Sequence, residues 1–488
     1  MSHHLPQLLS RAGLWVPAFA LVLAAGALNA APAPVTELQS HTRGPHLTDL
    51  AIPSVSRAVA GPLARGQRAR PDGPPFEVAR LDAPATTGYK MLGVTWRPGQ
   101  HTQHPRVEVK VRTDKGWGRW RRLANDPDGP DPRQYAASTR AGTEPLWVGP
   151  SEGVKVRVLS SHHTAPAGLE ANLIDPGAGP SMRLANTTIA PRPNIITRRQ
   201  WGANPKYRDQ CWKPIHGATE RGVVIHHTAG TNSYTKAQSD DLVRGIYYYH
   251  TRVRGWCDIG YNFLVSKYGQ VFEGRAGGFR YQVRGAHAGI FDVNKLMTGI
   301  ALMGNFDKVR PTRALRTATV RLVAWRLESF YRHPFGTTRI DGVRYPRIAG
   351  HRDVKATACP GKYVYAWLPT LRQRVKERIG AWRSNIYRKW QRLGGEDGWV
   401  GRPYRGERYL HRGRSTAFTH ATIYSSRAGT HEVHGPIRRA YARHGSTGGR
   451  LGYPRTDVFK TRAGERSNFQ GGYITWNRST RHTTIHYR

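Results

Sequence analysis

The stretch Arg221-Gly-Val-Val-Ile-His-His227 predicts a short buried strand, because a glycine and three apolar residues run without a break into two histidines. The sequence around it alternates helix and strand. Helical spacing covers residues 235–251 and 312–331, and strand patterns cover 261–265, 271–273 and 298–303. Gly269 is expected to turn the first two of these strands into a hairpin, and Pro360 is well placed in the first turn of a last helix. The sequence therefore predicts an α/β unit, which we place at residues 195–383.

Three segments of this unit hold residue types that bind zinc. His226 ends the strand, and His351 and Cys359 follow in Gly350-His-Arg-Asp353 and Cys359-Pro-Gly361. Two imidazoles and one thiolate leave the fourth tetrahedral position of zinc open. A zinc ion with an open position lowers the pKa of water to about 7 and polarises a carbonyl, which suits amide hydrolysis. Spacing alone leaves a structural role open for all three residues. His227 should point to the opposite face of the strand, and we interpret it as a packing residue.

Six motifs follow one another in the unit: Val224-Ile-His-His-Thr228, Gly255-Trp-Cys-Asp-Ile-Gly-Tyr-Asn-Phe-Leu264, Phe272-Glu-Gly-Arg275, Gly285-Ala-His287, Gly299-Ile-Ala-Leu-Met-Gly-Asn-Phe306 and Gly350-His-Arg-Asp353 with Cys359-Pro-Gly361. Together they resemble the peptidoglycan recognition protein family, the type 2 N-acetylmuramoyl-L-alanine amidases. The resemblance implies a central mixed β-sheet flanked by helices, with zinc in a cleft on one face.

The resemblance also implies roles for particular residues. It makes His226, His351 and Cys359 the zinc ligands, and it makes Tyr261 and Thr357 the catalytic pair, whose hydroxyls can stabilise a developing oxyanion. The implied reaction is hydrolysis of the amide bond between N-acetylmuramic acid and L-alanine of the stem peptide. A peptidoglycan-binding protein without catalysis is the alternative, although such relatives usually lack the metal cysteine.

Four further residues fall where relatives line the substrate groove: His250, Arg275, His287 and Asn294. The alternative is that they are ordinary polar residues of the surface or of hairpins. Relatives that prefer diaminopimelate often have Gly-Trp after the Glu-Gly-Arg motif. Ala276-Gly-Gly-Phe279 stands there instead, so the stem-peptide preference stays open. With Cys359 on the metal, Cys211 and Cys257 are left to form a disulfide, and two thiols are the alternative.

The N-terminal part predicts export followed by a small β-domain. Arg11 precedes an apolar run of about 17 residues, and small residues follow it, as in a secretory signal peptide at residues 1–33. A membrane anchor is the alternative, but spans normally need about 20 residues. Residues 34–75 are rich in Ala, Pro, Gly and Arg and predict a leader without a fold. Period-two alternation in residues 76–178 predicts an antiparallel β-sandwich-like domain. In it, Trp117 and Trp120 are either a carbohydrate platform or packing residues.

The C-terminal part, residues 395–488, contains an internal repeat. Val400-Gly-Arg-Pro403 recurs as Leu451-Gly-Tyr-Pro454, and Gly413 recurs as Gly464 at the same offset of 51 residues. The two copies resemble the LGFP repeats associated with wall attachment. Arg402 departs from the aromatic residue of that motif, whereas Tyr453 keeps it.

The charge of the chain indicates an acidic partner. It has 75 Lys and Arg against 32 Asp and Glu, a net charge of +43. We predict no nucleic-acid partner, because the arginines run through every region and no recognition helix, finger or stacking-sheet motif accompanies them. We therefore predict a multidomain protein, secreted and associated with the cell wall, that binds peptidoglycan and other acidic wall polymers and has no stable membrane anchor after signal cleavage.

Overall fold

The computed structural model describes residues 44–55, 76–98, 105–126, 139–161, 164–177, 192–208, 213–379 and 384–488. The predicted signal peptide lies outside these residues, as does most of the predicted leader. In the part of the chain that is described, no helix is both long enough and apolar enough to cross a membrane.

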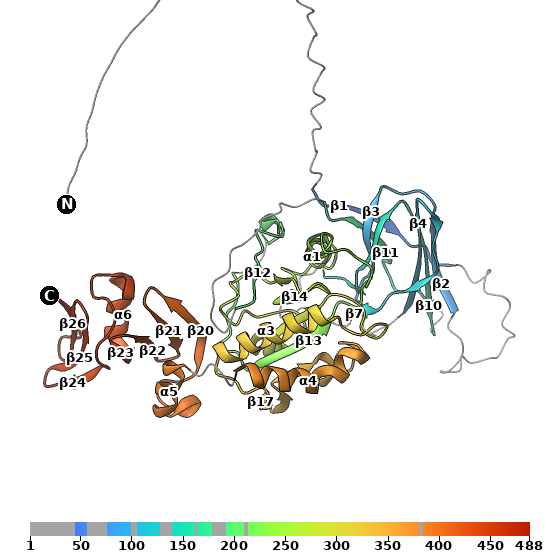
Figure 1. Ribbon diagram of the computed structural model, residues 1–488. Coiled ribbons are helices and arrows are strands. Elements are labelled where there is room, and N and C mark those ends of the chain that lie inside the picture. The colour runs from blue at the N-terminus through green and yellow to red at the C-terminus, as the bar shows by residue number, and fades with distance from the viewer. Residues whose placement is uncertain are drawn as a thin grey trace, which may run out of the picture. The chain divides into compact units, whose positions relative to one another are not determined.

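The N-terminal domain consists of two antiparallel sheets (Figure 1). One sheet has the order β1 (His46–Ala51), β11 (Glu170–Asp175), β3 (Tyr89–Trp96), β8 (Ala141–Thr143) and β7 (Asn125–Asp126), with β9 (Leu146–Ser151) also paired to β3. The other has the order β2 (Phe76–Ala83), β10 (Gly153–Ser160), β4 (Arg106–Thr113) and β5 (Gly116–Trp117), with β6 (Arg121–Arg122) paired to β4. Alternate valines of β4 and β10 are buried between the sheets, which confirms the predicted sandwich.

The prediction that residues 34–75 have no fold is wrong for β1. This strand pairs with β11 from His46 opposite Asp175 to Ala51 opposite Glu170. Its Leu50 packs on the core of the sandwich, and the following Ile52 is buried there. These apolar residues are too sparse among alanines, prolines and arginines to give a strand signal. The strand forms because β11 supplies the partner edge.

Trp117 and Trp120 lie under basic side chains. Lys155 Nζ lies 4.9 Å from the ring centroid of Trp117, and Arg157 Cζ lies 4.6 Å from that of Trp120. Such stacking covers one ring face with a cation. It favours the packing interpretation of these rings over a carbohydrate platform.

The central unit is built on the predicted mixed sheet. Its strand order is β12 (Ile195–Ile196), β15 (Val271–Glu273), β14 (Phe263–Val265), β16 (Met297–Leu302), β13 (Gly222–His227) and β19 (Ile348–Gly350). The hairpin of β14 and β15 is antiparallel, and the other pairs are parallel. The hairpin turns at Gly269, whose φ of +80° suits glycine.

Helices cover both faces of this sheet (Figure 1). Ile225, Phe263 and Leu302 pack with α3 (Arg313–Ser329) and α4 (Lys362–Ile379) on one face. Leu264 and Ala301 pack with α1 (Ser239–Tyr248) on the other. Because side chains alternate along a strand and His226 is paired with Ala301, His226 lies on the α1 face.

The N-terminal domain and the central unit share one hydrophobic core. Met91, Trp147 and Ile174 of the sandwich belong to the same buried cluster as residues of α1. Polar contacts add to it where α1 continues into the π-helix η3 (Tyr249–Val253). There the Tyr249 hydroxyl donates to the carbonyl of Thr143 at 2.6 Å. Just beyond, the Arg254 guanidinium pairs with the buried Asp126 carboxylate at 2.5 Å.

The C-terminal part repeats one fold twice. In the first copy α5 (Asn385–Arg392) and η5 (Gly395–Asp397) precede strands β20 (Pro403–Leu410), β21 (Gly413–Phe418), β22 (Ala421–Ser426) and β23 (Gly429–His434). In the second, α6 (Gly435–Arg443) and η6 (Ser446–Gly448) precede β24 (Phe459–Thr461), β25 (Gly464–Phe469), β26 (Gly472–Asn477) and β27 (Thr483–Tyr487). The ranges of η5, β21 and β22 recur as those of η6, β25 and β26, at the offset of 51 residues that the sequence shows. The first copy also starts earlier than the predicted residue 395, because Ile386 and Trp390 of α5 join its core.

Candidate metal centre

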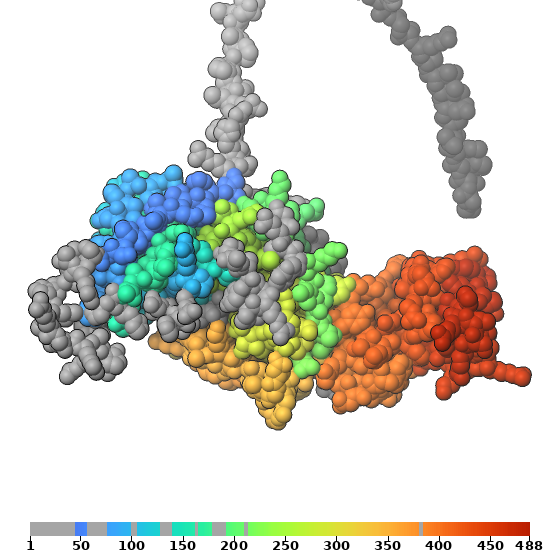
Figure 2. All heavy atoms as spheres, turned by 180° about the vertical axis from the view of Figure 1, so that it is seen from behind, coloured from blue at the N-terminus to red at the C-terminus, as the bar shows by residue number. Residues whose placement is uncertain are grey.

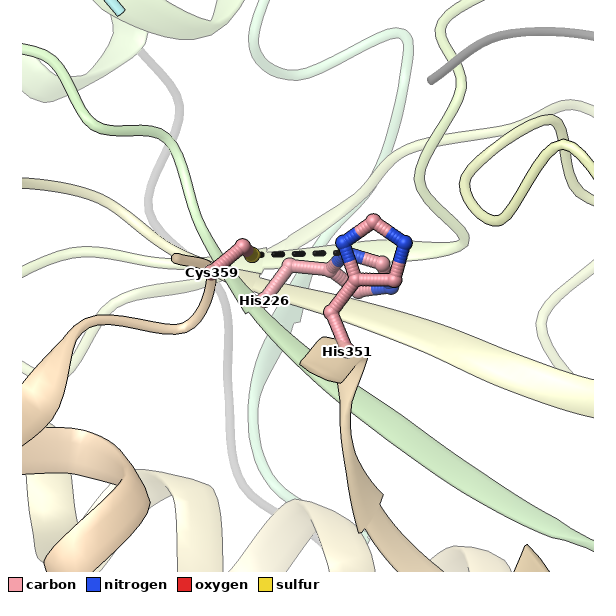
Figure 3. Close-up of side chains that lie close together, drawn as sticks. All are labelled: His226, His351 and Cys359. Atoms are coloured by element: carbon pink, nitrogen blue, oxygen red, sulfur yellow. Dashed lines mark hydrogen bonds between the residues drawn. The ribbon is translucent and has the colours of Figure 1, made fainter. Parts of the chain in front are cut away.

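The three predicted zinc ligands meet at one edge of the mixed sheet. His226 is near the end of β13, and His351 directly follows β19, its parallel neighbour. The carboxyl ends of parallel strands lie at the same sheet edge, so the topology itself brings the two imidazoles together. Cys359 comes from the loop that leads into α4. Figure 3 shows the three side chains converging, with Cys359 Sγ 3.7 Å from His226 Nδ1.

The donor set fits a zinc ion. One ligand atom from each residue lies within 4.8 Å of the others, and all three residues are buried. Zinc bonds of 2.0 to 2.3 Å in a tetrahedron place ligand atoms about 3.5 Å apart. The 3.7 Å between His226 Nδ1 and Cys359 Sγ is close to this value.

A third histidine, His287, fixes the protonation state of His226. His287 Nε2 lies 3.2 Å from the carbonyl of Met297, which can only accept, so this nitrogen carries the proton. His287 Nδ1 is then the acceptor for His226 Nε2–H, at 3.0 Å. This leaves His226 Nδ1, the atom that faces Cys359, with the lone pair that a metal needs.

The backbone around His287 is built to hold its ring in place. A Cβ at Gly285 or at Gly299 would collide with His287 Cδ2, so both positions require glycine for this close approach. The buried Asn294, on α2 (Phe291–Leu296), accepts the amide hydrogens of His287 at 2.8 Å and Ala288 at 3.0 Å. His287 thus contacts the predicted ligand His226, and Asn294 lies behind His287. Their predicted groove-lining role stays a prediction.

Electrostatics favour the metal-binding forms of these groups. Burial, and then the neighbouring His351, hold the pKa of His226 well below its usual value, so its imidazole is neutral. The Cys359 sulfur accepts the backbone N–H of His227 at 3.4 Å, which supports a thiolate. The His227 side chain points to the other face of the sheet, as predicted, where its Nδ1 accepts the N–H of Phe306 at 3.3 Å. Burial lowers the pKa of His227 to about 4.

Both predicted catalytic residues lie beside the predicted ligands. The ring centroid of Tyr261 is 5.5 Å from that of His226. The Thr357 hydroxyl oxygen accepts the N–H of Cys359 at 3.2 Å, which leaves its own proton to donate elsewhere. Their catalytic roles remain predictions that this placement supports.

The other two predicted groove residues are tied into the same region. His250 stacks on Trp256, with centroids 4.3 Å apart and planes at 27°, and its Nδ1 accepts the N–H of Gly260 at 3.2 Å. Arg275 donates to the carbonyl of Ile259 at 3.3 Å, and burial lowers its pKa. The sequence interpretation missed the support from Trp256, although the Gly255-Trp-Cys257 motif contained the signal.

The predicted disulfide is not tested by the structure. Cys257 is half-buried, but Cys211 lies outside the described residues. The pairing of Cys211 with Cys257 therefore stays a prediction.

Family models match three parts of the chain. The model described as N-acetylmuramoyl-L-alanine amidase matches residues 216–362. One described as Rv3811 N-terminal galactose-binding domain-like matches residues 50–180, and the LGFP repeat model matches residues 401–449. The three matches follow the order of the three structural parts.

Individual relatives agree with the central match. Peptidoglycan recognition protein 1 of Bos taurus is 35% identical over 174 residues, which are 35% of this chain and 80% of that protein. Its Mus musculus counterpart is 35% identical over 172 residues, covering 35% of this chain and 84% of that protein. Among solved structures, wild-type Drosophila PGRP-LB has 28% identity and a TM-score of 0.30, covering 36% of this chain and 93% of that one. The chain belongs to the peptidoglycan recognition protein and type 2 N-acetylmuramoyl-L-alanine amidase family, and it carries LGFP repeats at its C-terminal end.

Proposed function

We propose that this protein is a zinc-dependent amidase that cleaves the bond between N-acetylmuramic acid and L-alanine in peptidoglycan. Family membership by itself supports either peptidoglycan binding or amidase activity. The observation that favours catalysis is the buried set of His226, His351 and Cys359, which offers two imidazoles and a thiolate within 4.8 Å. A protein that only binds the wall has no need of this set.

Different residues of the chain would bind the metal, donate hydrogen bonds to the scissile amide and fix the tautomer of a ligand. Zinc held by the three ligands would lower the pKa of a water molecule and polarise the carbonyl. Tyr261 and Thr357 orient hydroxyl donors towards the carbonyl oxygen as it gains negative charge, an effect worth roughly 3 kcal/mol per donor in comparable sites. His287 keeps His226 in the metal-binding tautomer through the 3.0 Å hydrogen bond between them.

The test combines metal analysis with product analysis. Purified full-length protein is assayed for zinc by elemental mass spectrometry and then incubated with purified peptidoglycan. Mass spectrometry should find stem peptides with a free L-alanine amine, and it also reports the residue at the third stem position. Cys359→Ser should release no stem peptide while it still sediments with the wall. A zinc-loaded protein that releases nothing would refute the amidase and leave the wall-binding alternative.

We propose further that the protein acts outside the cell and that its repeats attach it to the wall. The net charge of +43 draws it to acidic polymers. The repeats, orange to red in Figure 2, also carry large exposed aromatic side chains, among them Trp399 at 48% and Phe459 at 41% exposure. Exposed aromatic rings of this kind suit stacking on sugars. Trp399→Ala with Phe459→Ala should reduce sedimentation with purified wall, and unchanged sedimentation would refute attachment through these rings.

A further inference from the structure

A pocket lies at the opposite end of strand β13 from the metal centre. It has a volume of about 210 Å³ and is lined by Arg221, Arg332, Thr337, Thr338, Arg339, Arg347, Glu396 and Arg402. Arg221 directly precedes β13, whereas His226 is near the end of that strand. At about 3.3 Å per residue, five residues separate the two places by roughly 16 Å. No lining residue belongs to the metal centre.

The lining is strongly unbalanced in charge. Five of the lining residues are arginines, and Glu396 is the one acidic side chain among them. The Glu396 carboxylate already pairs with three arginines. It contacts Arg332, lies 3.6 Å from Arg402 and lies 4.0 Å from Arg347. One carboxylate neutralises one charge, so the pocket keeps an excess of positive charge.

Carboxylates outside the lining reduce this excess only in part. Asp292 and Asp341 attract Arg221, and Glu220 attracts Arg332. Glu220, however, is fully buried and already paired with Arg326. The other arginines of the pocket have no comparable partner among these groups.

The backbone holds three of the arginines in place. Arg332 donates to the carbonyl of Glu220 at 2.7 Å, and its side chain is only 2% exposed. Arg347 donates to the carbonyl of Thr337 at 3.2 Å, and Arg221 donates to the carbonyl of Arg339 at 2.7 Å. These bonds stop the guanidinium groups from swinging apart into solvent, so the positive field is fixed in space.

Burial and the close approach of these arginines lower their pKa values. Burial, followed by repulsion from Arg347 and Arg402, lowers the pKa of Arg332 to about 9. Burial lowers the pKa of Arg347 and of Arg221 too, and Arg402 is the next cause for both. A bound anion would relieve this repulsion.

Arg402 is also the residue that departs from the repeat motif. In the second repeat the equivalent Tyr453 is buried, and its hydroxyl donates to the carbonyl of His411 at 2.7 Å. The first repeat replaces this buried aromatic anchor with a charged side chain that lines the pocket. The first repeat therefore lacks the buried aromatic ring at this position, and the pocket has one more cationic side chain instead.

We propose that this pocket binds a phosphate group, either as a free ion or monoester or as a phosphodiester in an anionic polymer. Phosphate offers oxygens in tetrahedral directions to guanidinium groups that come from several elements, and arginine forks bind such oxygens in pairs. The hydroxyls of Thr337 and Thr338 are further donors in the lining. A carboxylate has only two oxygens in one plane and a single charge, so it fits this lining less well.

The test is a titration of the full-length protein with inorganic phosphate, followed by calorimetry at constant ionic strength set with chloride. A Cys359→Ser background removes phosphate binding at the metal centre from the measurement. Arg339→Gln and Arg347→Gln should each weaken phosphate binding about tenfold or more. Arg316→Gln, an exposed arginine of α3, is the matched control because it removes the same charge elsewhere. It should leave the affinity within about twofold.

Competition then separates the two sources of the phosphate group. Displacement of inorganic phosphate by polyglycerol phosphate supports a polymer ligand, whereas binding of inorganic phosphate without such displacement supports a small phosphate. The proposal is overturned if both pocket variants bind phosphate as the control does, or if acetate displaces phosphate equally well. Should Arg347→Gln fail to fold, Arg339→Gln decides, because Arg339 is exposed. In the wild-type background the pocket variants should keep amidase activity, so failure here and failure of the proposed function are distinguishable.

Discussion

His287→Phe tests whether the residue behind His226, the first proposed zinc ligand, controls metal affinity. The substitution keeps a planar ring over Gly285 and Gly299 but removes the nitrogen that accepts from His226 Nε2–H at 3.0 Å. His226 is fully buried, so bulk water does not replace the lost acceptor. The proton of His226 is then no longer confined to Nε2, and its transfer to Nδ1 blocks the atom that faces the metal.

The expected loss of zinc affinity can be estimated from the removal of this one hydrogen-bond partner. Loss of such a partner typically weakens metal binding by about 10- to 100-fold, which corresponds to roughly 1.4 to 2.7 kcal/mol. Competition against a chromophoric chelator at neutral pH measures the zinc dissociation constant of the purified variant. His216→Phe is the matched control, because His216 also bonds a backbone carbonyl, that of Gly277 at 3.0 Å, but is exposed. A folded His287→Phe protein that binds zinc within about threefold of this control would refute the tautomer argument.

Three further substitutions each test the role of one side chain. Tyr261→Phe should lower kcat by about 10²- to 10³-fold at unchanged zinc content, as loss of one oxyanion donor does; an unchanged kcat would remove Tyr261 from the catalytic pair. Arg254→Met leaves the buried Asp126 carboxylate without its arginine and should destabilise the fold by about 3 to 5 kcal/mol, measured by denaturant unfolding. Adding Asp126→Leu should restore most of this loss, and a double variant as unstable as the single one would contradict the pairing. Burial, reinforced by the Glu407 charge, raises the pKa of Glu328 to about 8. The folded state then holds this proton more tightly than the unfolded state, so the stability it contributes is present below about pH 4.5 and is lost as the pH rises through about 8. Glu328→Gln should flatten this part of the melting-temperature profile, and an unchanged profile would contradict the assignment.

The sequence predicted those parts of the fold that depend on local pattern. The unbroken run before His226 predicted β13, Gly269 predicted the turn of the β14–β15 hairpin, and the valine alternation of β4 predicted the sandwich. Through the family resemblance the sequence also predicted the set of His226, His351 and Cys359, and the structure places these three side chains together. Each of these signals lies within a few residues of the feature that it predicts.

Other features depend on partners that are distant in sequence. β1 forms only because β11 offers an edge, and His287 meets His226 only because strand pairing brings β13 and β16 together. The two glycines that make room for the His287 ring were visible in the sequence, but nothing local tells which ring they accommodate. The arginine pocket likewise gathers residues from strand ends, a helix end and the first repeat, and no window of sequence contains it.

The core that Met91, Trp147 and Ile174 share with α1 limits how evolution or engineering can recombine this protein. Residues 195–383 resemble a cassette that could be moved into another chain. A cassette cut at residue 195 would expose the apolar side of α1, and the same cut would leave Asp126 behind without Arg254. A functional transplant would therefore have to carry the galactose-binding-like domain with it, and homologues that lack this domain should show a different, more polar surface on the corresponding helix.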